Sequence, residues 1–435
     1  MAPPRLFRKP GVPSDLVIRG ARVIDPTEGI DGCFDVTVEA GVISAITPGT
    51  PERDGLVLAP AFIDPHVHLR TPGREDEETI ATGTAAAAAG GFCAILAMPN
   101  TDPAVDSSAV LGALVELALE EAEVPVGFMA AISKQLAGQE LTEMVELAET
   151  GAVAFTDDGR PVASAGLMRR ALQYATVAHR VLALHEEEPA LTAGAHMHEG
   201  VVSAELGFAG YPSVGESVMV ERDIALAAYE RRPIHLMHLS ARESVEALRR
   251  GRAAGVPVSG EVSPHHLVLT DEAVRSLDPN VKMSPPLRAE EDRLALVAGL
   301  RDGTIEAIGT DHAPHARHEK ETPFEEAPNG VTGLETAFSS LYTHLVEPGV
   351  LPLPVLLERM SAGPARVFGL ERPRIAIGAP ANLVLLDLAA EWRVTEEGFR
   401  SRSVNSWLLG ATLRGQVLLT VAAGRVVFDR ALVVA

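Results

Sequence analysis

Short apolar runs rich in Val, Ile and Phe alternate along the chain with longer segments of helical period. The apolar runs are residues 62–69, 92–98, 127–132, 152–156, 181–185, 234–239, 256–262 and 305–309. The helical segments include residues 79–89, 141–149, 165–179, 217–231, 242–254 and 290–301. Eight βα units in about 250 residues are typical of a closed parallel barrel. We therefore predict an α/β protein built on a (β/α)8, TIM-like barrel.

The two ends of the chain show a different pattern, in which apolar and polar residues alternate between glycine turns. It covers residues 15–25, 34–46, 381–387 and 413–429, and it predicts half-buried β-strands. We expect a small β-sandwich domain formed from both termini, residues 1–58 and 371–435, with the barrel at 59–370. The alanine run 85–89 predicts a helix packed closely on the barrel, because small side chains permit near approach.

Charge and composition exclude several classes of protein. The formal net charge of -22 argues against binding to nucleic acid or to an anionic membrane surface, since both need clustered Lys and Arg. No stretch approaches the roughly 20 apolar residues that span a bilayer, and residues 1–16 lack the apolar run of a signal peptide. Cys33 and Cys93 are the only cysteines, as expected in a reducing compartment. We expect a soluble, cytoplasmic protein.

Polar residues of metal-binding type follow the predicted strands. In a barrel of this kind the βα loops meet at the carboxyl ends of the strands, so these residues should share one mouth. They are His66, His68 and Arg70 at strand one, Asp157 and Asp158 at strand four, His185 at strand five, His238 at strand six and Asp311 at strand eight.

Taken singly, each of these residues has an ordinary explanation. A His-x-His pair arises by chance, His185 and His238 could be hydrogen-bonded core histidines, and Asp311 could cap a helix. Together they would be a costly set of buried polar groups without an ion. Nitrogen and oxygen ligands without thiolate suit Zn²⁺ or a similar divalent ion, with Mn²⁺ and Co²⁺ as alternatives. The number of ligands implies two ions per chain. We expect Asp158 to bridge them and Asp157 to be a supporting or turn residue.

A series of motifs makes the chain recognisable. They are DPHVHLRTPG (64–73), MPNT (98–101), FTDDG (155–159), HLMHLS (235–240), EVSPHH (261–266), PPLR (285–288), TDHAPH (310–315), GLET (333–336) and SAGPAR (361–366). In this order the motifs strongly resemble the amidohydrolase superfamily, and within it the dihydroorotases of the larger, bacterial type. The resemblance implies reversible hydrolysis of the cyclic amide of (S)-dihydroorotate to N-carbamoyl-L-aspartate, a step of de novo pyrimidine biosynthesis.

The resemblance also implies how the metals are held. His66, His68 and Asp311 would bind one ion, and His185 and His238 the other, with a carboxylate and a hydroxide between them. Many relatives bridge their metals with a carboxylated lysine, but none of the four lysines lies at strand four, where Asp158 stands instead. This difference favours the aspartate-bridged dihydroorotases. Asp311 would act as the catalytic base and then as the acid.

The substrate carries a carboxylate, which the resemblance assigns to Arg70, Asn100 and His315. A guanidinium matches a carboxylate well, although Arg70 could instead pair with Glu75 or Asp76. Asn100 could be a turn residue, and His315 could be solvated. Further substrate contacts are expected from Ser284, Asn329 and Gly330.

Two of those positions depart from the family pattern, because relatives commonly have Asn at Ser284 and an aromatic residue at Asn329. Ser284 reaches less far than Asn, so recognition of the ring could be looser or could pass through water. The loops 101–106 and 316–330 are long enough to be lids, and ordinary surface loops are an equal alternative.

Two other functions remain open at this point. Ser284 gives some support to an allantoinase or hydantoinase, which Asp158, Arg70 and Asn100 oppose. The family also includes inactive paralogues that serve as structural partners of aspartate carbamoyltransferase, but those have lost metal ligands that this chain keeps. We expect a small-molecule substrate and a homo-oligomer, and a complex with aspartate carbamoyltransferase is retained because some active relatives form one.

Overall fold

The centre of the molecule is a nearly closed barrel of eight parallel strands in the computed structural model, which describes residues 4–51 and 54–430. The strands follow one another around the barrel as β5 (Phe62–Val67), β6 (Phe92–Ala97), β7 (Val126–Ala130), β8 (Ala154–Phe155), β9 (Leu182–Leu184), β12 (Ile234–Leu236), β13 (Val258–Val262) and β14 (Ala307–Ile308). A parallel bridge between Val67 and His312 connects the first strand with the segment after the last. The predicted barrel is confirmed.

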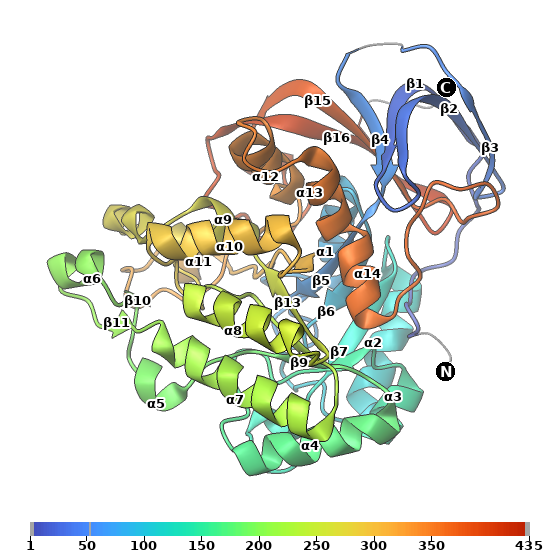
Figure 1. Ribbon diagram of the computed structural model, residues 1–435. Coiled ribbons are helices and arrows are strands. Elements are labelled where there is room, and N and C mark those ends of the chain that lie inside the picture. The colour runs from blue at the N-terminus through green and yellow to red at the C-terminus, as the bar shows by residue number, and fades with distance from the viewer. Residues whose placement is uncertain (1–3, 52–53, 431–435) are drawn as a thin grey trace.

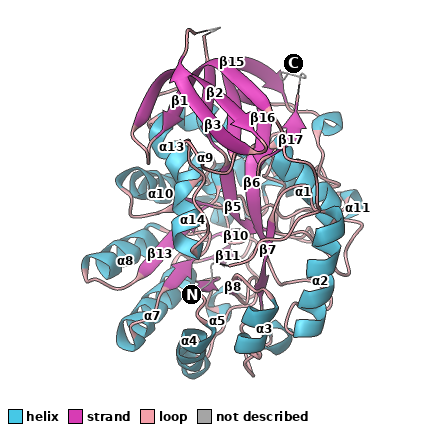
Figure 2. Cartoon of the chain, turned by 90° about the vertical axis from the view of Figure 1, so that its right-hand side faces the viewer, coloured by secondary structure: helices cyan, strands magenta, loops and turns pink. Residues whose placement is uncertain are grey.

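Helices surround the barrel, as Figure 2 shows. They are α1 (Ile80–Ala89), α2 (Ser108–Glu121), α3 (Met144–Thr150), α4 (Ala165–Ala178), α5 (Pro189–Thr192), α6 (Val201–Leu206), α7 (Val214–Glu230), α8 (Arg242–Ala253), α9 (Pro264–Val268), α10 (Glu290–Asp302), α11 (Arg317–Lys320), α12 (Ala337–Leu341), α13 (Leu353–Met360) and α14 (Ala362–Phe368). Each of the six predicted helical segments overlaps one of these helices. The loop 316–330 contains the single turn α11.

Several barrel strands are shorter than their apolar runs. β8 covers Ala154–Phe155 and β14 covers Ala307–Ile308, whereas the sequence predicted 152–156 and 305–309. The residues that follow β5, β12 and β14 include Arg70, His238 and Asp311, which have positive φ angles of 59°, 30° and 49°. A non-glycine residue in this region is strained, and such residues gather at functional sites. Arg70, His238 and Asp311 therefore lie just beyond the ends of their strands.

A second sheet lies beside the barrel and contains strands from both ends of the chain (Figure 1). Its order is β17 (Arg425–Asp429), β16 (Thr412–Ala422), β15 (Leu383–Arg393), β4 (Leu56–Pro60), β1 (Leu16–Asp25), β2 (Ile30–Glu39) and β3 (Val42–Pro48). Leu16, Val36, Leu58, Leu385 and Leu419 belong to a separate apolar cluster of this sheet. The expected β domain from both termini is thus present.

The exact division of the chain at residues 58 and 371 stays a prediction. Residues 1–3, 52–53 and 431–435 of the predicted terminal domain lie outside the described residues.

The alanine-rich helix α1 connects the two parts. It contacts β6 of the barrel and β16 and β17 of the terminal sheet. The Thr420 hydroxyl of β16 donates to the Ala88 carbonyl over 2.7 Å. Ala86 and Ala87 are fully buried. Small side chains are needed here because the helix is packed on two sides.

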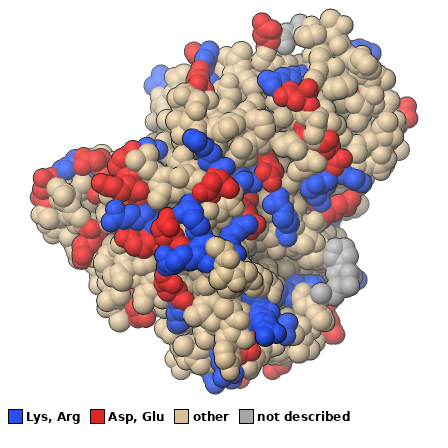
Figure 3. Space-filling model, viewed as in Figure 1, with Lys and Arg blue, Asp and Glu red and all other residues tan. Residues whose placement is uncertain are grey.

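On the face seen in Figure 3, Lys and Arg are interspersed with Asp and Glu. In the part of the chain that the structure describes, no helix has both the length and the apolar character needed to cross a membrane.

We predict that Ala87→Leu lowers the free energy of unfolding by about 1–3 kcal/mol, because the added atoms must displace either the barrel or the sheet. Urea titration followed by circular dichroism measures the change. Ala85→Leu is the matched control, since Ala85 lies on the same helix but is only partly buried. Equal stability of the two variants would contradict tight packing on both sides of α1.

Candidate metal centre and active-site cavity

Six predicted metal ligands meet at the carboxyl end of the barrel. His66 is in β5, and the others follow the strands: His68 follows β5, Asp158 follows β8, His185 follows β9, His238 follows β12 and Asp311 follows β14. All six side chains are buried. Residues more than 240 positions apart are thus brought together by the closure of the barrel.

Asp158 lies at the centre of this cluster. Its Oδ1 is 3.7 Å from His66 Nε2, 3.6 Å from His185 Nδ1 and 3.6 Å from His238 Nε2. Its Oδ2 is 3.6 Å from His68 Nε2. One carboxylate therefore faces all four imidazoles, which is the position expected of a bridging group.

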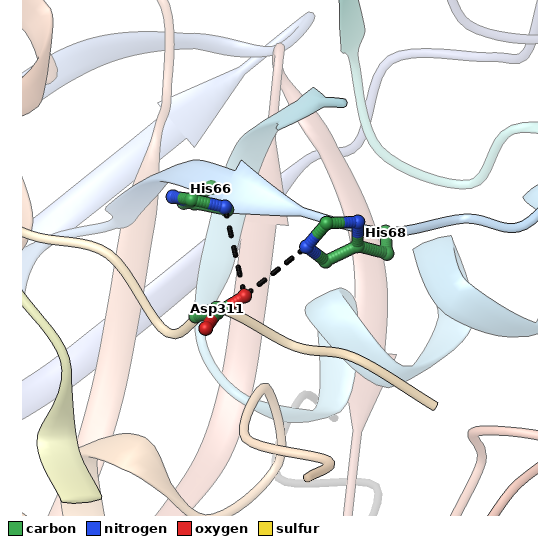
Figure 4. Close-up of side chains that lie close together, drawn as sticks. All are labelled: His66, His68 and Asp311. Carbon is green, nitrogen blue, oxygen red and sulfur yellow. Dashed lines mark hydrogen bonds and ion pairs between the residues drawn. The ribbon is translucent and has the colours of Figure 1, made fainter. Parts of the chain in front are cut away.

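Asp311 faces the two histidines of the first strand. Its Oδ1 is 3.5 Å from His66 Nε2 and 3.1 Å from His68 Nε2. Figure 4 shows both rings turned toward this carboxylate from one strand end. His66 and His68 are two positions apart, so their side chains share a face of the strand.

Three of the four imidazoles are held from the far side by an oxygen acceptor. His66 Nδ1 donates to Glu261 Oε1 over 2.8 Å, and His68 Nδ1 donates to Asn100 Oδ1 over 2.9 Å. His185 Nε2 donates to Glu187 Oε2 over 3.0 Å. A ring nitrogen that donates outward leaves the other nitrogen with a lone pair toward the centre. This is how metal-binding histidines are usually oriented.

The inward nitrogens need a cation. His185 Nδ1 and His238 Nε2 are 2.9 Å apart, and buried His66 Nε2 has no hydrogen-bond partner. Ligand atoms of His66, His68 and Asp311 lie within 4.8 Å of one another, as do those of His66, Asp158 and His238. Lone pairs and carboxylates that face each other in a buried site repel unless positive charge lies between them. The residues therefore fit divalent metal.

The pKa values of His66 and Asp158 also reflect the need for positive charge in this cluster. Burial alone would lower the pKa of His66, but the Asp311 carboxylate, the bond to Glu261 and the Asp158 carboxylate raise it to about 10. Burial opposes the charge of Asp158, yet its bonds to His185 and His238 hold its pKa well below the usual range. The carboxylates thus stay ionised and attract either protons or metal to the imidazoles.

Glu261 supports the cluster from inside the barrel. It is 1% exposed, and it accepts from His66 Nδ1 and, through Oε2, from His235 Nε2 over 3.0 Å. Burial works against its charge, but the bonds to His235 and His66 lower its pKa to about 2. Glu261 opens the motif at 261–266, but nothing in the sequence gave it a role.

Asp157 points away from the cluster. Its Oδ1 accepts from the backbone N–H groups of Ile132 and Ser133 over 2.8 and 3.0 Å, and its Oδ2 accepts from the Ser133 hydroxyl. This carboxylate therefore holds the loop after β7. Asp157 is placed as a supporting residue, next to the central Asp158.

A cavity of about 360 Å³ adjoins the metal cluster. Of the predicted substrate contacts, five line it: Arg70, Asn100, Ser284, Asn329 and Gly330. Asn100 is also bound within the cluster, because its Nδ2 donates to Asp158 Oδ2 over 2.9 Å. The cavity is thus lined by candidate metal ligands and by the other polar groups, which form the proposed substrate wall.

Arg70 is buried in that wall and pairs with neither Glu75 nor Asp76. Its Nε donates to the Pro314 carbonyl over 3.0 Å and lies 2.9 Å from Glu77 Oε2. Glu77 is fully buried and also pairs with Arg74. One side of the guanidinium is thereby fixed, while Arg70 still lines the cavity.

His315 does not line this cavity and stands behind Arg70. Its Nε2 is 3.3 Å from Arg70 Nη2 and donates to the Asn329 carbonyl over 2.8 Å. The side chain is buried, and burial together with the Arg70 charge lowers its pKa to about 3. His315 is therefore a neutral group that contacts two residues of the wall.

Other lining residues were not found from the sequence. Glu187, Thr192, Ala195 and Tyr211 line the cavity and come from the irregular segment between β9 and α7. This segment contains α5, α6 and the short paired strands β10 (Met197–His198) and β11 (Gly210–Tyr211). It has no apolar periodicity that would have placed it at the barrel mouth.

Comparisons with known proteins identify relatives of this chain. The family model described as Dihydro-orotase-like matches residues 55–244. A dihydroorotase of Trichlorobacter lovleyi is 44% identical over 95% of this chain and 99% of its own length. That of Citrifermentans bemidjiense is 45% identical over 95% of this chain and 100% of its own length.

Solved structures show a similar fold. L-hydantoinase from Arthrobacter aurescens superposes with a TM-score of 0.85 at 24% identity, covering 96% of both chains. At this level of identity, the likeness concerns the fold alone.

We predict that Glu261→Gln lowers the free energy of unfolding by about 3 kcal/mol, because it removes a buried charge between two imidazoles without changing the volume. Urea titration in the presence of a chelator measures this without a contribution from metal. Glu140→Gln is the control, since the Glu140 side chain is 70% exposed and pairs with Lys134 at the surface. The control should change stability by less than about 1 kcal/mol. A similar small change in Glu261→Gln would contradict the supporting role.

Proposed function

The chain belongs to the dihydroorotase family, and on this premise we propose that it catalyses the reversible hydrolysis of (S)-dihydroorotate to N-carbamoyl-L-aspartate. The observation that carries the proposal is the meeting of four inward-facing imidazoles and two carboxylates beside a cavity that Arg70 lines. The cluster supplies ligands for an amide-hydrolysing metal centre, and Arg70 supplies a cation for the substrate carboxylate. The reaction belongs to de novo pyrimidine biosynthesis.

We propose that two Zn²⁺ ions are held here, one by His66, His68 and Asp311 and the other by His185 and His238, with Asp158 shared between them. Support comes from the inward lone pairs and from a donor set of nitrogen and oxygen without thiolate. Bound divalent cations at this position would lower the pKa of water and polarise the amide carbonyl.

Asp311 is proposed as the catalytic base and acid. It lines the cavity, and its carboxylate is ionised because His66 and His68 outweigh the effect of burial and hold its pKa below the usual range. Its carboxylate would take a proton from the attacking water and deliver it to the departing ring nitrogen. A single group then serves both halves of the reaction.

The remaining polar residues of the cavity wall are proposed to bind the rest of the substrate. Arg70 and Asn100 would contact the substrate carboxylate, with His315 in contact with Arg70, while Ser284, Asn329 and Gly330 would face the ring. The guanidinium matches a carboxylate in shape and charge, and its orientation is fixed by Pro314 and Glu77.

A hydantoinase or allantoinase activity is the alternative from the sequence. The same fold occurs in hydantoinases, but a shared fold does not determine the substrate. Asp158 occupies the central position between the imidazoles, so no lysine is needed as a bridge.

Location and assembly stay predictions from the sequence. The sequence predicts a cytoplasmic protein that forms a homo-oligomer, and a complex with aspartate carbamoyltransferase is retained as a candidate assembly.

We predict that Asp158→Ala loses at least one of two bound zinc ions and lowers kcat by about 100-fold or more, because the shared ligand is removed. Metal analysis by mass spectrometry and a dihydroorotate hydrolysis assay measure the two effects. Asp157→Asn is the matched control, since this neighbouring carboxylate faces the loop after β7. Retention of both metals and of activity in Asp158→Ala would refute the bridging role.

We further predict that the enzyme turns over dihydroorotate in preference to allantoin and hydantoin, and that Arg70→Gln lowers kcat/KM for dihydroorotate by about 100-fold. Hydrolysis of dihydrouracil, the same ring without the carboxylate, should change little in this variant. Arg74→Gln is the control, because Arg74 also pairs with Glu77 but does not line the cavity. A preference for hydantoin or allantoin would favour the alternative function instead.

A further inference from the structure

The connection between β15 and β16, residues 394–411, crosses from the terminal sheet to the barrel mouth. The Ser403 hydroxyl donates to the Glu77 carbonyl over 2.7 Å, and the Ser401 hydroxyl donates to Glu78 Oε2. The Thr332 N–H donates to the Asn405 carbonyl over 3.0 Å. This connection therefore contacts both the segment that carries Glu77 and the segment after Gly330.

Asn405 makes the densest set of contacts in this connection. Its side-chain Oδ1 accepts a hydrogen bond from the backbone N–H of His315 over 3.0 Å. Its Nδ2 donates to the Ala313 carbonyl and to the Gly330 carbonyl, each over 3.2 Å. The residue is 6% exposed. The three bonds connect Asn405 with two wall segments, 313–315 and 329–330. These segments also contact each other directly, because His315 Nε2 donates to the Asn329 carbonyl and the Ala313 N–H donates to the Val331 carbonyl.

The two joined segments form the wall that the proposed function assigns to the substrate. Ala313 and Gly330 line the cavity, and His315 contacts Arg70 and the Asn329 carbonyl. Gly330 has a φ of 127°, and a Cβ at this position would lie 2.6 Å from the Ala313 Cβ. These two segments therefore approach each other closely within the cavity wall, and Asn405 bonds to both of them.

We propose that Asn405 is a positioning residue for the substrate site, contributed by the terminal β sheet rather than by the barrel. It bonds to both of the segments that carry His315 and Gly330 and helps to hold them in place. An amide suits this position because it offers two donors to the two carbonyls and one acceptor to the N–H group. This inference rests on the proposed function, since it assigns Asn405 to the support of proposed substrate contacts.

The test uses the zinc-loaded enzyme with Asn405→Leu, which keeps the branched shape of Asn but removes all three hydrogen bonds and adds no charge. We expect KM for dihydroorotate to rise about tenfold or more while kcat stays within about threefold, because binding is lost without a change at the reacting centre. In hydrogen exchange, the His315 amide should exchange faster, since its acceptor is gone.

Asn382→Leu is the matched control. Asn382 Oδ1 accepts from the Ala423 N–H within the terminal sheet, so this variant loses an asparagine bond in the same sheet but away from the barrel mouth. Its KM and the His315 exchange rate should match those of wild type. If Asn405→Leu does not fold, Asn405→Asp is judged by KM and kcat alone, because it keeps the acceptor for the His315 backbone N–H but loses both donors.

His315→Ala separates failure of this inference from failure of the proposed function. A raised KM in His315→Ala with an unchanged KM in Asn405→Leu would overturn the role of Asn405 and leave the proposed substrate wall in place. Unchanged KM values in both variants would overturn the substrate role of His315 as well. A fall in kcat alone in Asn405→Leu also contradicts the inference, because a positioning residue of the binding wall acts on KM.

Discussion

The structure depends on one electrostatic constraint, the concentration of ionised carboxylate at the buried mouth of the barrel. Asp158 and Asp311 face imidazole nitrogens, and the outward nitrogens of three rings are already committed to Glu261, Asn100 and Glu187. Such a group of acceptors is unfavourable in a buried site without a cation. The need for positive charge therefore explains the ligand set and also the residues that orient it.

The barrel meets this constraint through its geometry. Parallel strands place all their carboxyl ends at one mouth, so ligands distant in the sequence converge without a dedicated binding motif. Arg70, His238 and Asp311 adopt left-handed backbone conformations just beyond strand ends. Strained backbone of this kind persists where surrounding contacts hold it, and here it turns the side chains toward a common centre.

The sequence predicted the parts of the site that follow from periodicity and strand position. The strands and the convergence of His66, His68, Asp158, His185, His238 and Asp311 could be anticipated, because a strand end fixes where a side chain lies. Pairing inside loops could not, as shown by Arg70, which lies against Glu77 rather than Glu75 or Asp76. Asn405 was missed for a similar reason. No local sequence pattern shows that the connection between two strands of the terminal sheet reaches the mouth of the barrel.

The position of β4 within the terminal sheet has a consequence for biosynthesis. β4 pairs with β1 on one side and with β15 on the other, and it leads almost directly into the first barrel strand. During synthesis from the amino end, β1 to β4 emerge early, while β15 follows the entire barrel. One edge of β4 therefore stays without its native partner until late in translation, and exposed apolar edges of this kind promote aggregation. Protection of the nascent chain by chaperones would matter most during this interval.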